Sequence, residues 1–169
     1  METVEICAKI CKSKCCKSTP PALTSEDFNR ISKIQKDVKW FINIDEEDPK
    51  KKVVSKKEDK IRCFFLSNEG LCEIYNARPL DCELFPLFFK IDKINETEFL
   101  LRWYVWYCPL TESKGIDYLK DEASKKIQMI LNNKPKLLFE YQNAMYASQG
   151  YKKKHFLHEE RLKIIRSEE

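Results

Sequence analysis

The sequence contains little of several features on which common folds and catalytic sites depend. Only three glycines occur among 169 residues, so long flexible linkers are not expected. The two histidines, His155 and His158, lie in a charged C-terminal segment far from the cysteines, and we expect them at the surface. No phosphate-binding loop, dinucleotide-binding fingerprint or serine elbow is present. Catalysis by the usual side-chain constellations is therefore not expected.

Long hydrophobic runs and an excess of one charge are also missing. No segment approaches the roughly 20 apolar residues of a membrane span, because Pro86 and Arg102 interrupt the longest apolar patches. Lysines break up the N-terminal segment, so no signal peptide is expected, and a reducing cytoplasmic location follows. The net charge is only +4 although 34% of residues are charged. Neither a membrane nor nucleic acid is called for as a partner.

Cysteine, by contrast, is abundant, and the length suits one domain with a real core. In a reducing compartment, eight cysteines more often indicate metal or redox chemistry than disulfides. Disulfides stay open as an alternative, because the cytosol of hyperthermophiles can contain them. Soft thiolates select zinc, copper(I) or iron-sulfur clusters. All eight are candidate metal ligands: Cys7, Cys11, Cys15, Cys16, Cys63, Cys72, Cys82 and Cys108.

The spacing of the cysteines limits how they can share an ion. On a straight helix Cys7 and Cys15 would lie about 12 Å apart, whereas thiolates on one zinc lie about 2.3 Å from it. The two can share an ion only if the helix bends or ends between them. Eight cysteines also exceed the four that one zinc or one cubane cluster needs. One site with spare thiols and two neighbouring centres both remain open, and Cys63 and Cys108 could instead be small buried hydrophobes.

The segment from Cys72 to Pro86 adds an arginine and a tyrosine between two cysteines. The permanent charge of Arg78 could offset the negative charge of a thiolate-ligated ion or hold an anionic substrate. Its alternative role is a surface ion pair with Glu73 or Asp81. Tyr75 could donate a hydrogen bond to a ligand sulfur, or could simply pack in the core.

These motifs together resemble the YkgJ-type cysteine-cluster family, a zinc- or iron-chelating domain. The resemblance covers about residues 7–110 and rests on the following segments: Cys7, Cys11 and Cys15-Cys16, residues 21–26 (Pro-Ala-Leu-Thr-Ser-Glu), residues 63–66 (Cys-Phe-Phe-Leu), Cys72–Pro86 and Cys108-Pro109. The opening spacing is looser than the family's common form. The resemblance implies metal binding through these cysteines, and a distant similarity to flagellin lysine N-methylases implies a methyl-transfer role. Against that role, no S-adenosylmethionine-type glycine-rich loop is present.

Several functions fit these observations. A metal-cluster protein with a redox or modifying activity is the first, in which the metal, a free thiol or carboxylates such as Asp81 and Glu83 would act. A zinc-stapled interaction module without catalysis is the alternative, and a metal carrier is a third. A protein partner or protein substrate is compatible with any of them. Thiolate spacing does not distinguish iron-sulfur from zinc.

The sequence predicts an α+β fold, with a small antiparallel sheet and helices around the metal centre. Residues 1–110 are expected to form the metal-binding domain, and residues 111–169 a helical extension packed on it. Thr24 and Asp27 form a capping box that starts a helix. The expected elements are a helix over residues 25–41, a solvated loop over 45–60, a strand over 61–66, a hairpin of 85–94 with 97–107, and helices over 116–131, 135–147 and 155–166.

Overall fold

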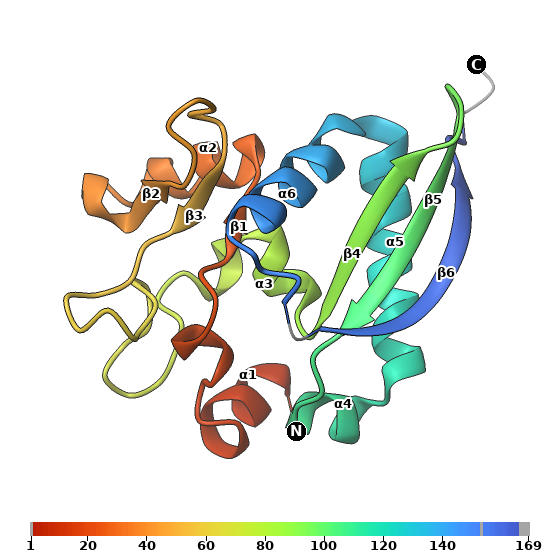
Figure 1. Ribbon diagram of the computed structural model, residues 1–169. Coiled ribbons are helices and arrows are strands. Elements are labelled where there is room, and N and C mark those ends of the chain that lie inside the picture. The colour runs from red at the N-terminus through yellow and green to blue at the C-terminus, as the bar shows by residue number, and fades with distance from the viewer. Residues whose placement is uncertain (1, 153, 166–169) are drawn as a thin grey trace.

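The computed structural model describes residues 2–152 and 154–165. Its elements, in chain order, are α1 (Thr3–Glu5), η1 (Ile6–Ile10), η2 (Cys15–Lys17), β1 (Ala22–Leu23), α2 (Ser25–Ile34), η3 (Val38–Trp40), β2 (Phe41–Asn43), β3 (Lys52–Val54), η4 (Tyr75–Ala77), α3 (Leu80–Leu84), β4 (Leu87–Lys93), β5 (Glu98–Val105), α4 (Pro109–Lys114), α5 (Ile116–Asn133), α6 (Lys136–Ala147) and β6 (His155–Lys163). The fold is α+β, as the sequence predicts, and its strands form two antiparallel three-stranded sheets (Figure 1).

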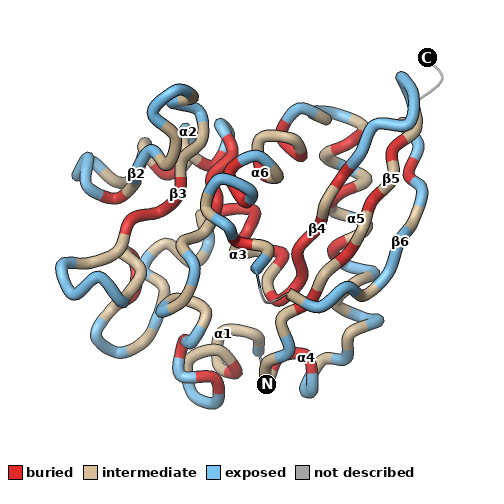
Figure 2. The backbone as a smooth tube through the Cα atoms, in the orientation of Figure 1, coloured by how far each residue is buried: buried red, intermediate tan, exposed pale blue. Residues whose placement is uncertain are grey.

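The larger sheet has the strand order β4-β5-β6. The hairpin of β4 and β5 is confirmed, with Phe89 opposite Trp103. Side chains on β5 alternate between buried and partly exposed, so that Phe99, Leu101 and Trp103 face the core. α5 and α6 supply apolar residues to the same core, where Tyr141 of α6 stacks on Phe89 at 4.5 Å between ring centroids. Figure 2 shows the buried positions running along these strands.

The smaller sheet has the order β1-β3-β2, with strands of two to three residues. Its central strand corrects the prediction of a solvated loop over residues 45–60. Val53 and Val54 are each only 1% exposed, because two adjacent valines among lysines pair with strands on both sides. The dense charge around them hid this short apolar pair.

Two further predictions about boundaries and type were wrong. The capping box of Thr24 and Asp27 is confirmed, but α2 ends at Ile34 instead of Phe41. Asp37 accepts a hydrogen bond from the Lys39 N–H at 2.8 Å and starts a new turn, after which residue 41 begins β2. The expected helix over 155–166 is strand β6, since its backbone pairs with β5 along the whole edge. Lys153 of the basic tail and Arg166 lie outside the described residues.

α6 lies between the two sheets, and contacts β1 on one side and β4 on the other. Asp81 of α3 joins the same elements. Its carboxylate accepts hydrogen bonds from the Ala22 N–H at 2.9 Å and from the Tyr141 hydroxyl at 3.3 Å. α3, which carries Cys82, is therefore held against both β1 and α6. Helices α5 and α6 confirm the predicted helices in the C-terminal third.

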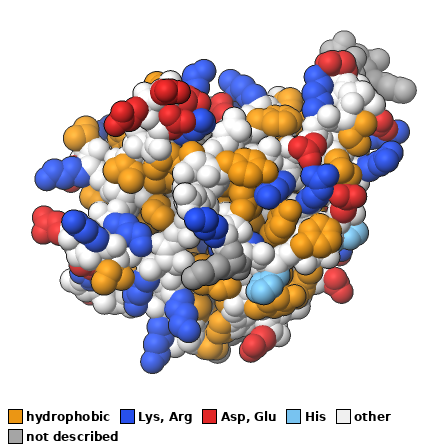
Figure 3. All heavy atoms as spheres, in the orientation of Figure 1, with side chains coloured by type: hydrophobic (Ala, Val, Ile, Leu, Met, Phe, Trp, Pro, Cys, Tyr) orange, Lys and Arg blue, Asp and Glu red, His pale blue; other side chains and the backbone are white. Residues whose placement is uncertain are grey.

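Charged side chains are dispersed over the face shown in Figure 3, where lysines and arginines alternate with carboxylates and apolar groups. His155 and His158 are exposed, as expected. In the described part of the chain, no helix has both the length and the apolar character that crossing a bilayer requires.

Candidate metal centre

The N-terminal cysteine segment contains two short helices, η1 and η2, which a turn separates. Cys7 lies in η1, and Cys11, which is 5% exposed, follows its last residue. Lys12 and Ser13 then adopt left-handed backbone angles, with φ of 51° and 54°. The chain reverses there, and the Ser13 N–H returns to the Cys7 carbonyl at 2.8 Å. The helix thus ends between Cys7 and Cys15, which is the condition under which the two thiols can approach one site.

Two hydrogen bonds join this segment to the second cysteine group, about 50 residues later in the chain. The Ser13 hydroxyl donates to the Gly70 carbonyl at 2.7 Å, and the Cys63 N–H donates to the Cys16 carbonyl at 2.7 Å. Gly70 has a φ of +80°, a conformation that side chains disfavour. The tight turn it makes therefore presents its carbonyl to Ser13 just before Cys72.

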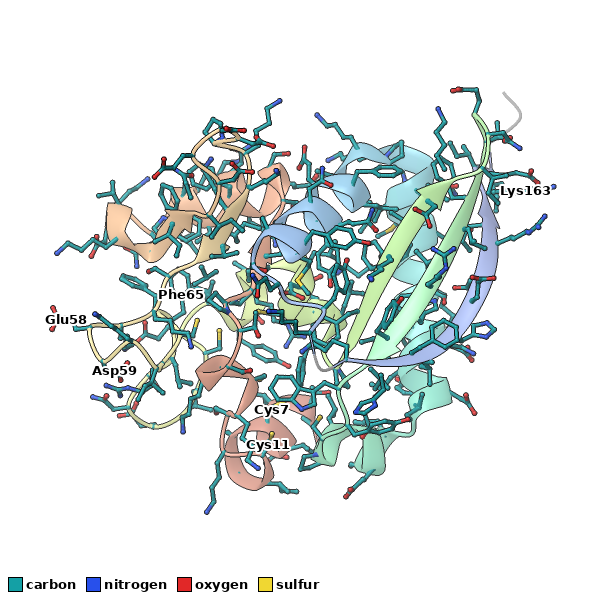
Figure 4. The ribbon with its side chains drawn as sticks, viewed as in Figure 1. Cys7, Cys11, Glu58, Asp59, Phe65 and Lys163 are labelled. Carbon is teal, nitrogen blue, oxygen red and sulfur yellow. The ribbon has the colours of Figure 1, made fainter. Side chains whose placement is uncertain are left out.

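The prediction of a strand over residues 61–66 is wrong. The segment instead makes single antiparallel bridges, of Cys63 with Lys56 and of Leu66 with Cys72. Phe65, which Figure 4 labels, is buried in the small core beside β3. These bridges fold the two cysteines of this loop back toward each other. Irregular backbone replaces the strand because the loop is pinned at both ends to other segments.

Six of the eight cysteines line a single cavity of about 220 Å³. They come from four separate segments of the chain: Cys7, Cys15, Cys16, Cys63, Cys72 and Cys82. Cys11 and Cys108 are not among its lining residues, although Figure 4 shows Cys11 close to Cys7. All eight are free thiols. The structure thus brings together residues that the sequence could only group by type.

The sulfur donors have the chemistry that a soft metal prefers, but they do not converge on one common position. Among the described residues, no three His, Cys, Asp or Glu side chains converge at metal-ligand distances. The Cys15 and Cys16 sulfurs are 3.9 Å apart, close to the ~3.8 Å edge of a zinc-centred thiolate tetrahedron with 2.3 Å bonds. An ion would have to draw the remaining sulfurs inward to bind.

Burial disfavours the charged form of these thiols. It raises the pKa of Cys7 to about 12 and the pKa of Cys63 to about 11, and neighbouring thiols act in the same direction. Burial also raises the pKa of Cys82 well above its ordinary value. The thiolate forms therefore need a positive charge beside them, which a bound metal ion supplies.

Arg78 is the fixed positive charge of the cavity. Its guanidinium lies 4.2 Å from the centre of the Tyr75 ring, and both residues line the cavity. The backbone carbonyl of Arg78 accepts a hydrogen bond from Arg30 at 2.8 Å, which fixes the segment. In the described part of the chain, Arg78 makes no ion pair with Glu73 or Asp81, so its charge stays available to the cavity.

Lys154 is a cavity residue that the sequence did not reveal. Its ammonium lies 4.0 Å from the Phe88 ring centre and 4.2 Å from that of Trp106, and burial lowers its pKa. Lys154 directly precedes strand β6, whose pairing with β5 places it at the cavity. No local sequence pattern predicted that strand.

Beside these side chains, Asp81 lines the same cavity and is 7% exposed. Burial raises the pKa of its carboxyl to about 6, against the hydrogen bond from the Ala22 N–H, which lowers it. The cavity therefore combines six thiols with one guanidinium, one ammonium and two carboxyl groups, of which Asp81 is buried and Glu83 pairs with Lys126.

Comparison with curated proteins and comparison with solved structures gave no match. Comparison with protein families matched residues 6–109, more than half of the chain, to the family named CxxCxxCC and described as a "putative zinc- or iron-chelating domain". The matched range includes every cysteine from Cys7 to Cys108, as well as Arg78, but not Lys154. The metal binding expected from the thiols and the choice of zinc or iron as the metal agree with that description. The chain belongs to the CxxCxxCC family of zinc- or iron-chelating domains.

Proposed function

We propose that the chain is an iron-sulfur protein whose cluster lies in the cysteine-lined cavity and serves a redox or modifying reaction. One observation carries the proposal: six thiols from four segments line one cavity of about 220 Å³ together with Arg78, which forms no ion pair among the described residues. A cluster supplies one-electron transfer or a Lewis-acidic iron when it is bound. The cysteines hold it, and the remaining lining residues control what reaches it.

The spread of the thiols supports a cluster over a single zinc. One zinc draws four sulfurs to about 3.8 Å from each other, given Zn–S bonds of 2.3 Å. A cluster places its own iron and sulfide atoms between the protein sulfurs, so its ligands lie further apart. Six thiols around a cavity of this volume, with no three of the described donors converged, fit the larger group better.

The open wall of the cavity supports a reaction over a purely structural role. Structural zinc sites are closed by four protein ligands, whereas reactive centres keep an open side. Here the lining continues beyond the sulfurs to Arg78, Trp106 and Lys154. A guanidinium and an ammonium can bind and orient an anionic group of a substrate, and the aromatic wall excludes water from it.

The test is to purify the protein without oxygen and measure iron, sulfide, zinc and the visible spectrum. We expect brown protein with iron and sulfide in equal amounts, and visible absorption that disappears on reduction. Colourless protein with stoichiometric zinc and no sulfide overturns the iron-sulfur assignment. Protein without either metal overturns metal binding altogether.

A pair of matched variants tests whether Arg78 acts on the centre. Arg78→Gln removes a positive charge from the cavity wall, so we expect a more negative reduction potential. Arg102→Gln is the control, because Arg102 pairs with Asp92 and Glu159 on the larger sheet. Equal potentials in the two variants would show that Arg78 does not influence the cluster.

The second candidate function is a zinc-stapled module without catalysis, and one observation favours it. The core beside the cysteines contains only five buried side chains: Leu23, Ile31, Trp40, Val54 and Phe65. A core of this size needs another source of stability, which a structural metal provides. Zinc in place of iron, together with unchanged zinc content in Arg78→Gln, is the result that this function predicts.

A further inference from the structure

We infer that the eight cysteines form two adjacent four-thiolate centres, and that Cys15 and Cys16 give one sulfur to each. The inference rests on the proposed metal function and goes beyond it, because a single cluster needs only four of the eight thiols. The other six divide into two sets of three. The first set is Cys7, Cys11 and Cys108, and the second is Cys63, Cys72 and Cys82.

The first set is held together by the packing of η1 against α4. Cys7 and Cys11 lie in and directly after η1, where Figure 4 labels them side by side. Cys108 is the N-terminal cap of α4, and the Thr111 hydroxyl fixes its backbone by donating to the Cys108 carbonyl at 2.6 Å. α4 thus presents the Cys108 thiol to η1.

The vicinal pair, Cys15 and Cys16, lies beside this set through Cys7. The turn at Lys12 and Ser13 reverses the chain after η1, and Cys7 and Cys15 line the same cavity. Cys11 and Cys108 lie outside the lining of that cavity, at the contact between η1 and α4.

All three cysteines of the second set line the cavity, which Cys7 is alone in reaching from the first set. The bridge between Leu66 and Cys72 folds the loop so that Cys63 and Cys72 both line the cavity. α3 brings Cys82 to the same wall. Cys15 and Cys16 line the same cavity as these three cysteines. The vicinal pair therefore lies beside the second set as well.

The vicinal pair lies at the boundary between the two sets. The Cys15 and Cys16 sulfurs are 3.9 Å apart, so two ions bound to them would be neighbours. Cys16 is tied to the second set through its carbonyl, which accepts a hydrogen bond from the Cys63 N–H. Cys15 lines the cavity together with Cys7 of the first set and Cys82 of the second. Three cysteines plus one of the pair complete four thiolates on each side, which is the complement of one zinc or one cubane cluster.

The experiment counts centres on the unaltered protein and then removes them separately. Protein purified without oxygen is analysed by native mass spectrometry, elemental analysis and visible spectroscopy. We expect two centres per chain. The double variant Cys11→Ser/Cys108→Ser should retain one, Cys63→Ser/Cys82→Ser should retain the other, and Cys15→Ser/Cys16→Ser should retain neither.

The outcomes separate this inference from the proposed function. One centre per chain in the unaltered protein overturns the two-centre inference and leaves the metal function standing. Full retention of metal in Cys11→Ser/Cys108→Ser would also overturn the two-centre inference. This measurement does not depend on the number of centres counted in the unaltered protein. An unaltered protein that binds no metal removes both. If a double variant does not fold, the count on the unaltered chain still decides the question.

Discussion

The two sheets of this protein are stabilised to very different extents by apolar burial. The β4-β5-β6 sheet has strands of seven to nine residues and a core of nineteen buried residues that includes helices α5 and α6. The β1-β3-β2 sheet has strands of two to three residues and a core of five. Since apolar burial is the main favourable contribution to folding, the smaller sheet and the cysteine loops need a second source of stability.

The difference indicates where metal contributes most to the fold. The loops carrying Cys63 and Cys72 contain only single bridges, and their order depends on contacts to the N-terminal segment. The hairpin of β4 and β5 has a full ladder of pairs. We therefore expect metal to order the first region and to leave the second nearly unaffected.

Removal of the metal should give the largest effect. Structural metal contributes about 10 kcal/mol or more to the folding of small thiolate domains. Treatment with a chelator should abolish hydrogen-exchange protection in β1, β3 and residues 55–75, while amides of β4 and β5 stay protected. The measurement is hydrogen exchange by mass spectrometry with and without chelator. Uniform loss of protection over both sheets would contradict the comparison.

Truncation of a side chain in the larger core should lower global stability without loss of metal. Phe89→Ala removes a 0% exposed ring that stacks on Tyr141, and such truncations cost about 3–5 kcal/mol. We expect global destabilisation in denaturant, with metal content unchanged under native conditions. Phe156→Ala is the control, since that ring is 60% exposed. Loss of metal at full global stability would show that the two regions are not separable in this way.

The sequence predicted the larger region better than the smaller one. Local signals marked the β4–β5 hairpin, α5 and α6, because alternation and helical periodicity extend over many residues there. The capping box of Thr24 and Asp27 was equally local and equally correct. The buried strand of Val53 and Val54 was missed, since two residues give no period to recognise.

The remaining misses depend on contacts between distant segments. The segment of β6 was predicted as a charged helix carrying Phe156, Leu162 and Ile165, yet pairing with β5 decides its conformation. Cysteine type and count predicted a thiolate site, and the family match agrees with it. The position of Lys154 in the cavity follows from tertiary packing alone. The contact of Lys154 with Phe88 cannot be predicted from the spacing of residues in the sequence.

A smaller effect should come from the carboxylate that joins α2 to the second cysteine group. Asp27 is 2% exposed and accepts from Thr24, from Arg30 and from the Leu80 N–H at 3.2 Å. Asp27→Ala leaves these donors without a partner, at a cost of about 2–3 kcal/mol. Because Leu80 begins the helix of Cys82, we also expect faster loss of metal to a chelator.

Glu26→Ala is the matched control for that prediction. Glu26 is also an acid in the first turn of α2, but it is exposed and pairs with Lys134 on the surface. Surface pairs contribute little, so metal loss should keep its original rate in this variant. Equal rates of metal loss in Asp27→Ala and Glu26→Ala would show that the hydrogen bonds of Asp27 do not influence metal retention.

The smallest effect should come from the cap itself. Thr24→Ala removes the hydroxyl that accepts from the Asp27 N–H, and such cap losses cost about 1 kcal/mol. The Thr24 hydroxyl also donates to the Asp27 carboxylate at 2.8 Å, so the free energies of unfolding for Thr24→Ala and Asp27→Ala should not add in the double variant. Thr97→Ala, in the exposed β4–β5 turn, should change stability by less than about 0.5 kcal/mol. Strict additivity of the first two would mean that Asp27 stabilises the cysteine region without the cap, through Leu80 and Arg30 alone.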